Sequence, residues 1–314
     1  MILTNRKGGF VSRLWQAFIK DLTKNKFLYL MAIPVIAYYL IFHYKPIYGA
    51  IIAFKDYSPA LGILGSPWVG LKHFRDFFES IYFWRLIRNT FMISFYQLLF
   101  GFPAPIILAL LLNEVRNKYF KSTVQTITYL PHFISLVVVC GMIRDFTLSH
   151  GVINDIIVWF EGTRLALLQN PNLFRTIYVS SGIWQEIGWG SIIYLATLSG
   201  IDQQQYEAAA IDGAGRFRQM LYITIPGLMP TVIILLILRL GRMLSVGFEK
   251  IILLYNPATF ETADVISSFV YRRGLQELNW SYSSAVGLFN STINFILLVI
   301  ANKISRQVNE TSLW

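Results

Sequence analysis

Four long apolar segments of the sequence each carry polar or small residues spaced three, four or seven positions apart. Residues with this spacing lie on one face of an α-helix. The four sets are Thr90, Ser94, Gln97 and Gly101; Gln125, Thr128, His132 and Ser135; Gly182, Gln185, Glu186 and Trp189; and Gly287, Asn290, Ser291 and Asn294. Their amides and hydroxyls have two interpretations at this point: hydrogen bonds to a passing solute, or packing between membrane helices.

Glu186 is the residue that packing explains least. A carboxylate near the middle of an apolar helix costs about 2.5 kcal/mol or more to insert into a membrane, so it should face a wet cavity or a partner such as His132. Trp189, one turn later, offers a flat apolar face on which a sugar ring can stack, whereas Trp184 is expected to point away. We therefore predict a solute path that includes Gln97, His132, Gln185, Glu186, Trp189, Asn290 and Asn294.

The sequence carries no pattern for covalent, nucleotide or metal chemistry. It has no G-x-x-x-x-G-K-[ST] phosphate loop and no G-x-S-x-G nucleophile motif. The histidines at positions 43, 73, 132 and 150 are dispersed, and a single cysteine, Cys140, supports no disulfide framework. We therefore expect no catalytic residue, no metal site and no cofactor on this chain.

Composition predicts that helices in a membrane position these residues. Apolar residues make up 55% of the 314 positions and charged residues only 14%, which is too apolar for a soluble domain of this length. The net charge of +10 comes from basic residues scattered over short polar connections. Nucleic-acid binding would need a sustained basic stripe, so we do not expect it.

A window of about 20 residues, the length of a membrane-spanning helix, finds six candidate crossings. They are Phe27 to Tyr44, Thr90 to Leu112, Thr123 to Ile143, Ile177 to Leu198, Ile223 to Leu240 and Ala285 to Ile304. Basic residues dominate the stretch before the first crossing and the connection "NEVRNKYFKS". The positive-inside rule therefore predicts that both termini are cytoplasmic. We expect a cytoplasmic segment 1–26, a transmembrane domain 27–304 and a cytoplasmic tail 305–314.

The stretch "EAAAIDGAGRFRQMLYITIP", residues 207–226, differs from the apolar segments on both sides. Asp202 can cap a helix through the Ala-rich "QQQYEAAAI", and Gly213 or Gly215 can end it in the left-handed conformation. A second short helix, "RFRQMLYIT", is expected to lead back to the membrane, with Pro226 in the first turns of the fifth crossing. A surface helix with small side chains suits either docking of a partner or simple packing on its own bundle.

This stretch resembles the signature loop of the inner-membrane permease subunits of binding-protein-dependent ABC importers. The matching residues are Glu207, Ala208, Ala209, Gly213, Ile223, Ile225 and Pro226. The segments "WVGLKHF", "FWRLIRNT" and "YLPHFIS" are similar to the oligosaccharide-uptake branch, and "DVISSFVYRRGL" resembles the polysaccharide-type permeases of that branch. The likeness runs from about Trp68 to the end. Many relatives have proline at position 202 or 203, where Asp202 can start the helix equally well.

The resemblance implies an all-α membrane protein with the six-helix architecture of a type I ABC importer permease. Its loop, about residues 200–226 and including Tyr206 and Asp212, would hold a coupling helix that docks on a cytoplasmic ATPase. ATP and Mg²⁺ would bind that partner and not this chain. The implied assembly holds two ATPase subunits, a second and usually distinct permease, an extracytoplasmic solute-binding protein and an oligosaccharide, in the bacterial cytoplasmic membrane.

Two alternatives stay open at the level of the sequence. The solute can be a peptide or an amino acid, or the chain can be a membrane enzyme or scaffold without transport. The outward segment "FKDYSPALGILGSPWVGLKHFRDFFESIYFWR" is aromatic and basic. It suits docking of the solute-binding protein, but aromatic belts at the level of lipid headgroups have the same composition.

Overall fold

The structure is a computed structural model, and it describes residues 19–309. Within this range the backbone is mostly helical, and the one β contact is an isolated bridge between Lys55 and Trp68. Most of the expected N-terminal segment 1–26 and half of the expected tail 305–314 lie outside the described residues.

The first part of the chain leads from one lone helix to the second crossing. Its elements are α2 (Lys26–Tyr39), η1 (Leu40–Tyr44), α3 (Lys45–Ile47), η2 (Tyr48–Phe54), α4 (Gly62–Gly65), α5 (Lys72–Phe78), α6 (Phe83–Tyr96), η3 (Gln97–Gly101) and α7 (Pro103–Glu114). The middle part holds α8 (Lys118–Tyr129), η4 (Leu130–Phe133), α9 (Leu136–Thr147), α10 (Val152–Glu161), η5 (Leu167–Gln169) and α11 (Pro171–Ser199).

The last part begins with the predicted surface helix. Its elements are α12 (Gln203–Ile211), α13 (Arg216–Gln219), η6 (Met220–Thr224), α14 (Ile225–Leu240), α15 (Phe248–Leu254), η7 (Pro257–Thr259), α16 (Phe260–Ala263), α17 (Ile266–Tyr271), η8 (Arg272–Gln276) and α18 (Trp280–Asn309).

Five helical stretches among the described residues are long and apolar enough to cross a membrane. They are Lys26–Phe54, Phe83–Glu114, Leu136–Phe160, Arg216–Leu240 and Trp280–Gln307. The predicted fourth crossing lies within α11, a single helix of 29 residues. At 1.5 Å per residue this helix is about 44 Å long and can also span the bilayer. Glu186, Gln185 and several Ser and Gly residues make it less apolar than the others.

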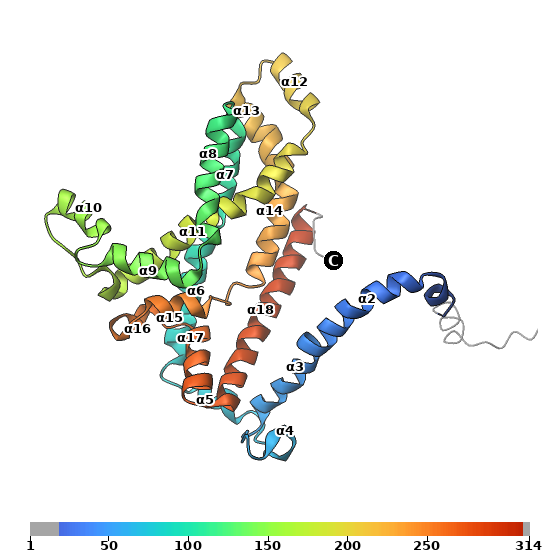
Figure 1. Cartoon of the computed structure of the whole chain (residues 1–314), viewed down its shortest axis with the longest axis vertical. Helices are drawn as coiled ribbons and strands as arrows, with labels where there is room; N and C mark the ends of the chain where they lie inside the picture. Colours follow the sequence, from blue (N-terminus) through green and yellow to red (C-terminus); the bar gives the residue numbers. More distant parts are fainter. Residues whose placement is uncertain (1–18, 310–314) are drawn as a thin grey trace, which may run out of the picture.

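The prediction of one continuous third crossing from Thr123 to Ile143 was wrong. α8 ends at Tyr129, a 3-10 turn covers Leu130–Phe133, and α9 starts only at Leu136. Pro131 has no N–H for an α-helical hydrogen bond, and Ser135 begins a new helix by accepting a bond from the Val138 amide. As a result, α9 lies crosswise to α8 and leads away from the bundle to α10 (Figure 1).

Three of the long helical stretches contain a π turn that ends two residues before a proline. The pairs are Leu40–Tyr44 with Pro46, Gln97–Gly101 with Pro103, and Met220–Thr224 with Pro226. A proline ring crowds the carbonyl four positions earlier and cannot donate to it, and a wide turn gives that carbonyl room. The helices therefore pass through these prolines without ending.

α11 is the central helix of the bundle and contacts both α7 and α8. A Cβ at Gly188 would lie 2.1 Å from the backbone carbonyl oxygen of Thr128, so only glycine allows α8 to come this close. On the α7 side, buried Tyr194 and Leu198 pack with Ala109 and with Leu228 of α14. Further buried clusters join α11 to α9 and α15, and join α5, α6, α17 and α18 to one another.

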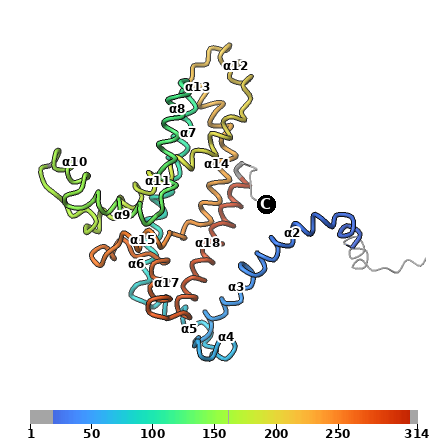
Figure 2. The backbone as a smooth tube through the Cα atoms, viewed as in Figure 1, coloured from blue at the N-terminus to red at the C-terminus, as the bar shows by residue number. Residues whose placement is uncertain are grey.

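α12 lies at one end of the molecule together with the connection from α7 to α8, and α4 and α5 lie at the opposite end (Figure 1). The two segments expected on the cytoplasmic side, α12 and the α7–α8 connection, thus lie at the end opposite α4 and α5, which belong to a segment expected on the outer side. α2 buries none of its side chains and stands apart from the bundle, to which it is joined where η2 packs on α18 (Figure 2).

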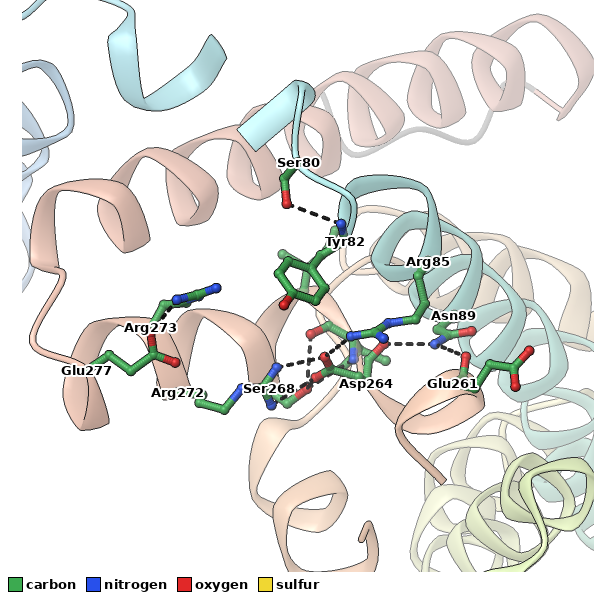
Figure 3. Close-up of polar contacts among 12 residues, drawn as sticks. Ser80, Tyr82, Arg85, Asn89, Glu261, Asp264, Ser268, Arg272, Arg273 and Glu277 are labelled. Atoms are coloured by element: carbon green, nitrogen blue, oxygen red, sulfur yellow. Dashed lines mark hydrogen bonds and ion pairs between the residues drawn. The ribbon is translucent and has the colours of Figure 1, made fainter. Parts of the chain in front are cut away.

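A buried ion network holds together the part of the bundle where α6, α11 and α17 meet (Figure 3). The carboxylate of Asp264 is fully buried and accepts hydrogen bonds from Arg272 at 2.7 Å, Ser268 at 2.8 Å and Arg85 at 3.2 Å. Asn89 of α6 donates to the carbonyl of Asp264 and accepts from Arg175 of α11. The network thus fixes α6, α11 and the segment before α17 to one another.

Candidate functional site

The predicted surface helix is α12, and local capping determines both of its ends. Asp202 accepts a hydrogen bond from the Gln204 amide at 2.9 Å, so the N-cap expected from the sequence is confirmed. Gly213 has φ +75°, the left-handed conformation expected at the helix stop, and the amide of Ala214 donates to the carbonyl of Ala209. Gly215 has φ −68° and does not share this role.

The return from α12 differs from the expected separate short helix. α13, η6 and α14 are continuous from Arg216 to Leu240, so Pro226 lies inside a long helix rather than at its start. The π turn before Pro226 makes this continuity possible. The hydroxyl of Tyr206 lies 3.0 Å from that of Thr224 and ties α12 to the returning helix.

The residues of the signature loop divide into an exposed set and a supporting set. Glu207, Ala208, Asp212, Gly213 and Pro226 are exposed, and Tyr206, Ala209 and Ile223 are half-buried. Ile211 at the tip is 87% exposed. The loop therefore presents a small apolar surface with two carboxylates beside it.

A cavity of about 540 Å³ lies between η3, α7, α11, α14 and α15. Its polar wall is formed by Gln97, Gln185, Glu186, Arg239, Ser245 and Lys250. Three of the seven residues predicted for the solute path, Gln97, Gln185 and Glu186, thus line one cavity. The remaining wall is apolar and includes Phe102, Ile183 and Tyr194.

His132 and Trp189 lie beside Glu186, outside the cavity wall. His132 Nδ1 is 3.0 Å from a carboxylate oxygen of Glu186, so the pairing expected from the sequence is present. The imidazole also stacks on the indole of Trp189, with ring centroids 4.4 Å apart and planes inclined by 2°. One face of Trp189 is therefore covered by His132, and 45% of the residue stays exposed. The stack holds the indole in one orientation.

The two asparagines of α18 lie elsewhere, and neither lines the cavity. The amide of Asn294 is 7% exposed, accepts a hydrogen bond from the Leu244 backbone and donates to Ser245. Its amide thus supports the turn after α14, and binding of a solute by Asn294 stays a prediction. Asn290 is half-buried, and its Oδ1 has no hydrogen-bond partner within residues 19–309.

Sequence reasoning missed Lys250, which lies on α15 between the predicted crossings. The residue is 7% exposed, and its ammonium donates to the backbone carbonyl of Tyr178 at 3.0 Å and lies 4.8 Å from the centre of that ring. Burial lowers the pKa of Lys250 to about 8. The pattern "GFEKIILL" carries a faint signal, because a lysine there interrupts an otherwise apolar helix face.

The family comparison excludes one alternative left open by the sequence, a membrane enzyme or scaffold without transport. A family described as binding-protein-dependent transport system inner membrane component matches residues 101–310, more than half of the chain. The chain belongs to this family. It is therefore a permease, a transport subunit of the membrane that works with a binding protein, and not an enzyme. ATP hydrolysis in such importers takes place on a separate chain.

Relatives match this permease over nearly its whole length. It is 47% identical to Protein LplB of Bacillus subtilis (strain 168), with 96% of this chain and 94% of LplB covered. It is 45% identical to the polygalacturonan/rhamnogalacturonan transport system permease protein YteP of the same organism, with 93% and 92% covered.

A solved structure has the same fold. It is a chain of a bacterial ABC transporter involved in the import of the acidic polysaccharide alginate, with 46% identity and a TM-score of 0.87 over 95% of this permease and 99% of that chain. A second structure of a bacterial alginate transporter, in complex with an alginate pentasaccharide-bound periplasmic protein, gives 45% identity and the same TM-score. The permease thus has the type I importer architecture predicted for it.

Proposed function

We propose that this permease forms half of the membrane pathway for ATP-driven uptake of an oligosaccharide. The observation that carries the proposal is the cavity of about 540 Å³ between η3, α11 and α14, whose wall offers the amides of Gln97 and Gln185 and the hydroxyl of Ser245. Amides and hydroxyls suit a solute covered with hydroxyls. The printed names of YteP and of the alginate transporter, both concerned with polysaccharides, support the same class of solute.

We further propose that α12 is the coupling helix. In this role Glu207, Ala208, Ala209, Asp212 and Gly213 dock in a cleft of a cytoplasmic ATPase subunit, while Tyr206, Ile223 and Pro226 hold the loop to the bundle. The exposure of Ile211 and the bond between Tyr206 and Thr224 support it. ATP and Mg²⁺ bind the ATPase partner, and closure of the two ATPase subunits moves α12 and the helices joined to it.

The assembly that we propose contains a second, distinct permease, two ATPase subunits and an extracytoplasmic solute-binding protein. The lone helix α2, which buries none of its side chains within this chain, supports a further membrane partner. We place residues 1–26 and 305–314 in the cytoplasm and residues 27–304 in the bacterial cytoplasmic membrane. The basic residues before the first crossing and in the α7–α8 connection support this orientation.

The test uses the complete importer in proteoliposomes, with its binding protein on the outside. Uptake of labelled oligosaccharides, peptides and amino acids is compared, with and without ATP inside. ATP-dependent uptake of an oligosaccharide and of no peptide or amino acid is expected. A second arm compares Glu207→Ala with Gln205→Ala, an exposed control on the same helix. We expect Glu207→Ala to abolish ATP-driven uptake and Gln205→Ala to retain it. In the first arm, uptake of peptides in place of saccharides would refute the proposed class of solute.

A further inference from the structure

The charges around the solute cavity are strongly unbalanced. A second cavity of about 290 Å³, lined by Ser94, Gln97, Arg239, Arg242 and Ser245 among others, shares Gln97, Arg239 and Ser245 with the first. The two cavities therefore have a common wall. The ionisable residues that line the two cavities are three cations, Arg239, Arg242 and Lys250, and one carboxylate, Glu186, and of these Arg239 lines both. We call the linings of the two cavities together the cavity wall.

None of the three cations has a carboxylate within 4.0 Å among the residues that the structure describes. Glu186 is directed to His132 instead. Lys250 is the clearest case, because it is 7% exposed and uses one of its three N–H groups, on the carbonyl of Tyr178. A buried ammonium is normally paired, and an unpaired one is costly to keep charged.

Two neutral groups on the same wall also have spare hydrogen-bonding capacity. The hydroxyl of Ser94 is buried, at 5% exposure, and has no partner within the described part of the chain. Gln97 accepts a long bond of 3.5 Å from Arg239, so both side chains remain free to rearrange around a ligand. The wall thus combines positive charge with unused donors and acceptors.

We infer that this wall selects an anionic saccharide, with the carboxylate of a uronic acid unit held by Lys250 and Arg239 and its hydroxyls held by Ser94, Gln97 and Gln185. This inference rests on the proposed import of oligosaccharides. A guanidinium and an ammonium on one carboxylate form charge-assisted hydrogen bonds, which are stronger than bonds to neutral hydroxyls. A neutral sugar leaves the excess of positive charge, three cations against the one carboxylate of Glu186, unbalanced.

The test compares matched pairs of solutes in proteoliposomes of the complete importer. The probes are trisaccharides of galacturonate, mannuronate and guluronate, each beside its carboxyl-reduced neutral counterpart. For each variant the ratio of acidic to neutral uptake is divided by the wild-type ratio, which cancels the preference of the binding protein. The variants are Lys250→Met and Arg239→Gln, the charge-retaining Lys250→Arg and Arg239→Lys, and Lys303→Met as an exposed control outside both cavities.

We expect Lys250→Met and Arg239→Gln to lower the ratio about ten-fold, as loss of one charge-assisted hydrogen bond does, and the other three variants to keep it within about three-fold. An equal loss of acidic and neutral uptake would give Lys250 and Arg239 a purely structural role and overturn the inference. Wild-type uptake of neutral trisaccharides alone would also overturn it while leaving oligosaccharide import intact. Uptake of no trisaccharide at all would refute the proposed function itself.

Discussion

The guanidinium of Arg85 lies 3.2 Å from the carboxylate of Asp264, although 179 positions separate the two residues in the sequence. Arg85 belongs to "FWRLIRNT" at the start of α6, and Asp264 belongs to "DVISSFVYRRGL" before α17. Arg272, one helical turn beyond Ser268, contacts the same carboxylate (Figure 3). Two segments that look unrelated along the chain therefore form one buried ion cluster.

Replacement of Asp264 tests this cluster. Asp264→Ala leaves two partly buried guanidinium groups without their counter-charge, and breaking a buried pair in this way costs about 3–5 kcal/mol. We expect a marked fall in the thermal unfolding temperature of the purified importer. Asp155→Ala is the control, because its pair with Arg164 is exposed and worth at most about 1 kcal/mol. Equal stability of the two variants would contradict a stabilising role for the cluster.

The contact of α8 with α11 gives a second prediction. Gly188→Ala places a Cβ 2.1 Å from the Thr128 carbonyl oxygen and forces the two helices apart, so we expect poor assembly of the complex. Gly287→Ala is the matched control in α18, where a Cβ would meet nothing within 4 Å. This change should be neutral or should stabilise the complex by up to about 1 kcal/mol. Assembly yield after detergent extraction distinguishes the two variants.

The turn after α12 gives a third prediction. Gly213 has φ +75° and open space where a Cβ would stand, so a substitution there strains the backbone without a steric clash. Gly213→Val should cost about 1–2 kcal/mol and weaken binding of the ATPase subunits about 5- to 30-fold, while Gly213→Asn should keep most of the affinity. Pull-down of the ATPase with the solubilised permease measures the effect. Similar binding by both variants would mean that the left-handed turn is unimportant for docking.

Trp189 and Trp184 provide a matched pair on α11, because their exposed fractions are nearly equal, 45% for Trp189 and 43% for Trp184. Trp189 stacks on His132, and removal of an aromatic contact of this kind costs about 0.5–1.5 kcal/mol. If its free face also meets the solute, Trp189→Ala should lower uptake about ten-fold or more, while Trp184→Ala has a smaller effect. A complex that assembles normally and transports at the wild-type rate with Trp189→Ala would assign the stack to packing alone.

Membrane orientation is tested with single cysteines, because the native Cys140 is buried. Glu79 is exposed in the connection before α6, and Gln307 is exposed near the end of α18. In intact cells an impermeant maleimide should label Glu79→Cys and should leave Gln307→Cys unlabelled until the membrane is permeabilised. Labelling of Gln307→Cys from outside would reverse the proposed topology.

Features that depend on a few neighbouring residues could be predicted from the sequence. The Asp202 cap and the left-handed Gly213 follow from local hydrogen bonding and backbone sterics, and both are present. The predicted pairing of Glu186 with His132 also held, because an intramembrane carboxylate must find a polar neighbour. The break at Pro131 was missed, since a hydropathy window averages across a proline that interrupts the backbone.

Features that depend on contacts between distant helices could not be predicted in the same way. Lys250 lies outside every apolar segment, and its burial results from the packing of α15 on α9 and α11. Asn294 has the spacing of a solute-facing residue, but the turn at Leu244 and Ser245 folds back onto its amide. Helical spacing assigns a residue to a face, whereas the neighbour of that face is determined only by the assembled bundle.

The isolation of α2 has a consequence for how the protein reaches its membrane. A helix that buries no side chain within its own chain gains its stability from lipid or from another subunit, and not from the other crossings. It can therefore enter the bilayer during synthesis, before the rest of the chain has left the ribosome. The less apolar α11, with Glu186 in its sequence, gains less from lipid and needs α7 and α8 around it. Biogenesis should thus begin with an anchored first helix and be completed when α11 is enclosed.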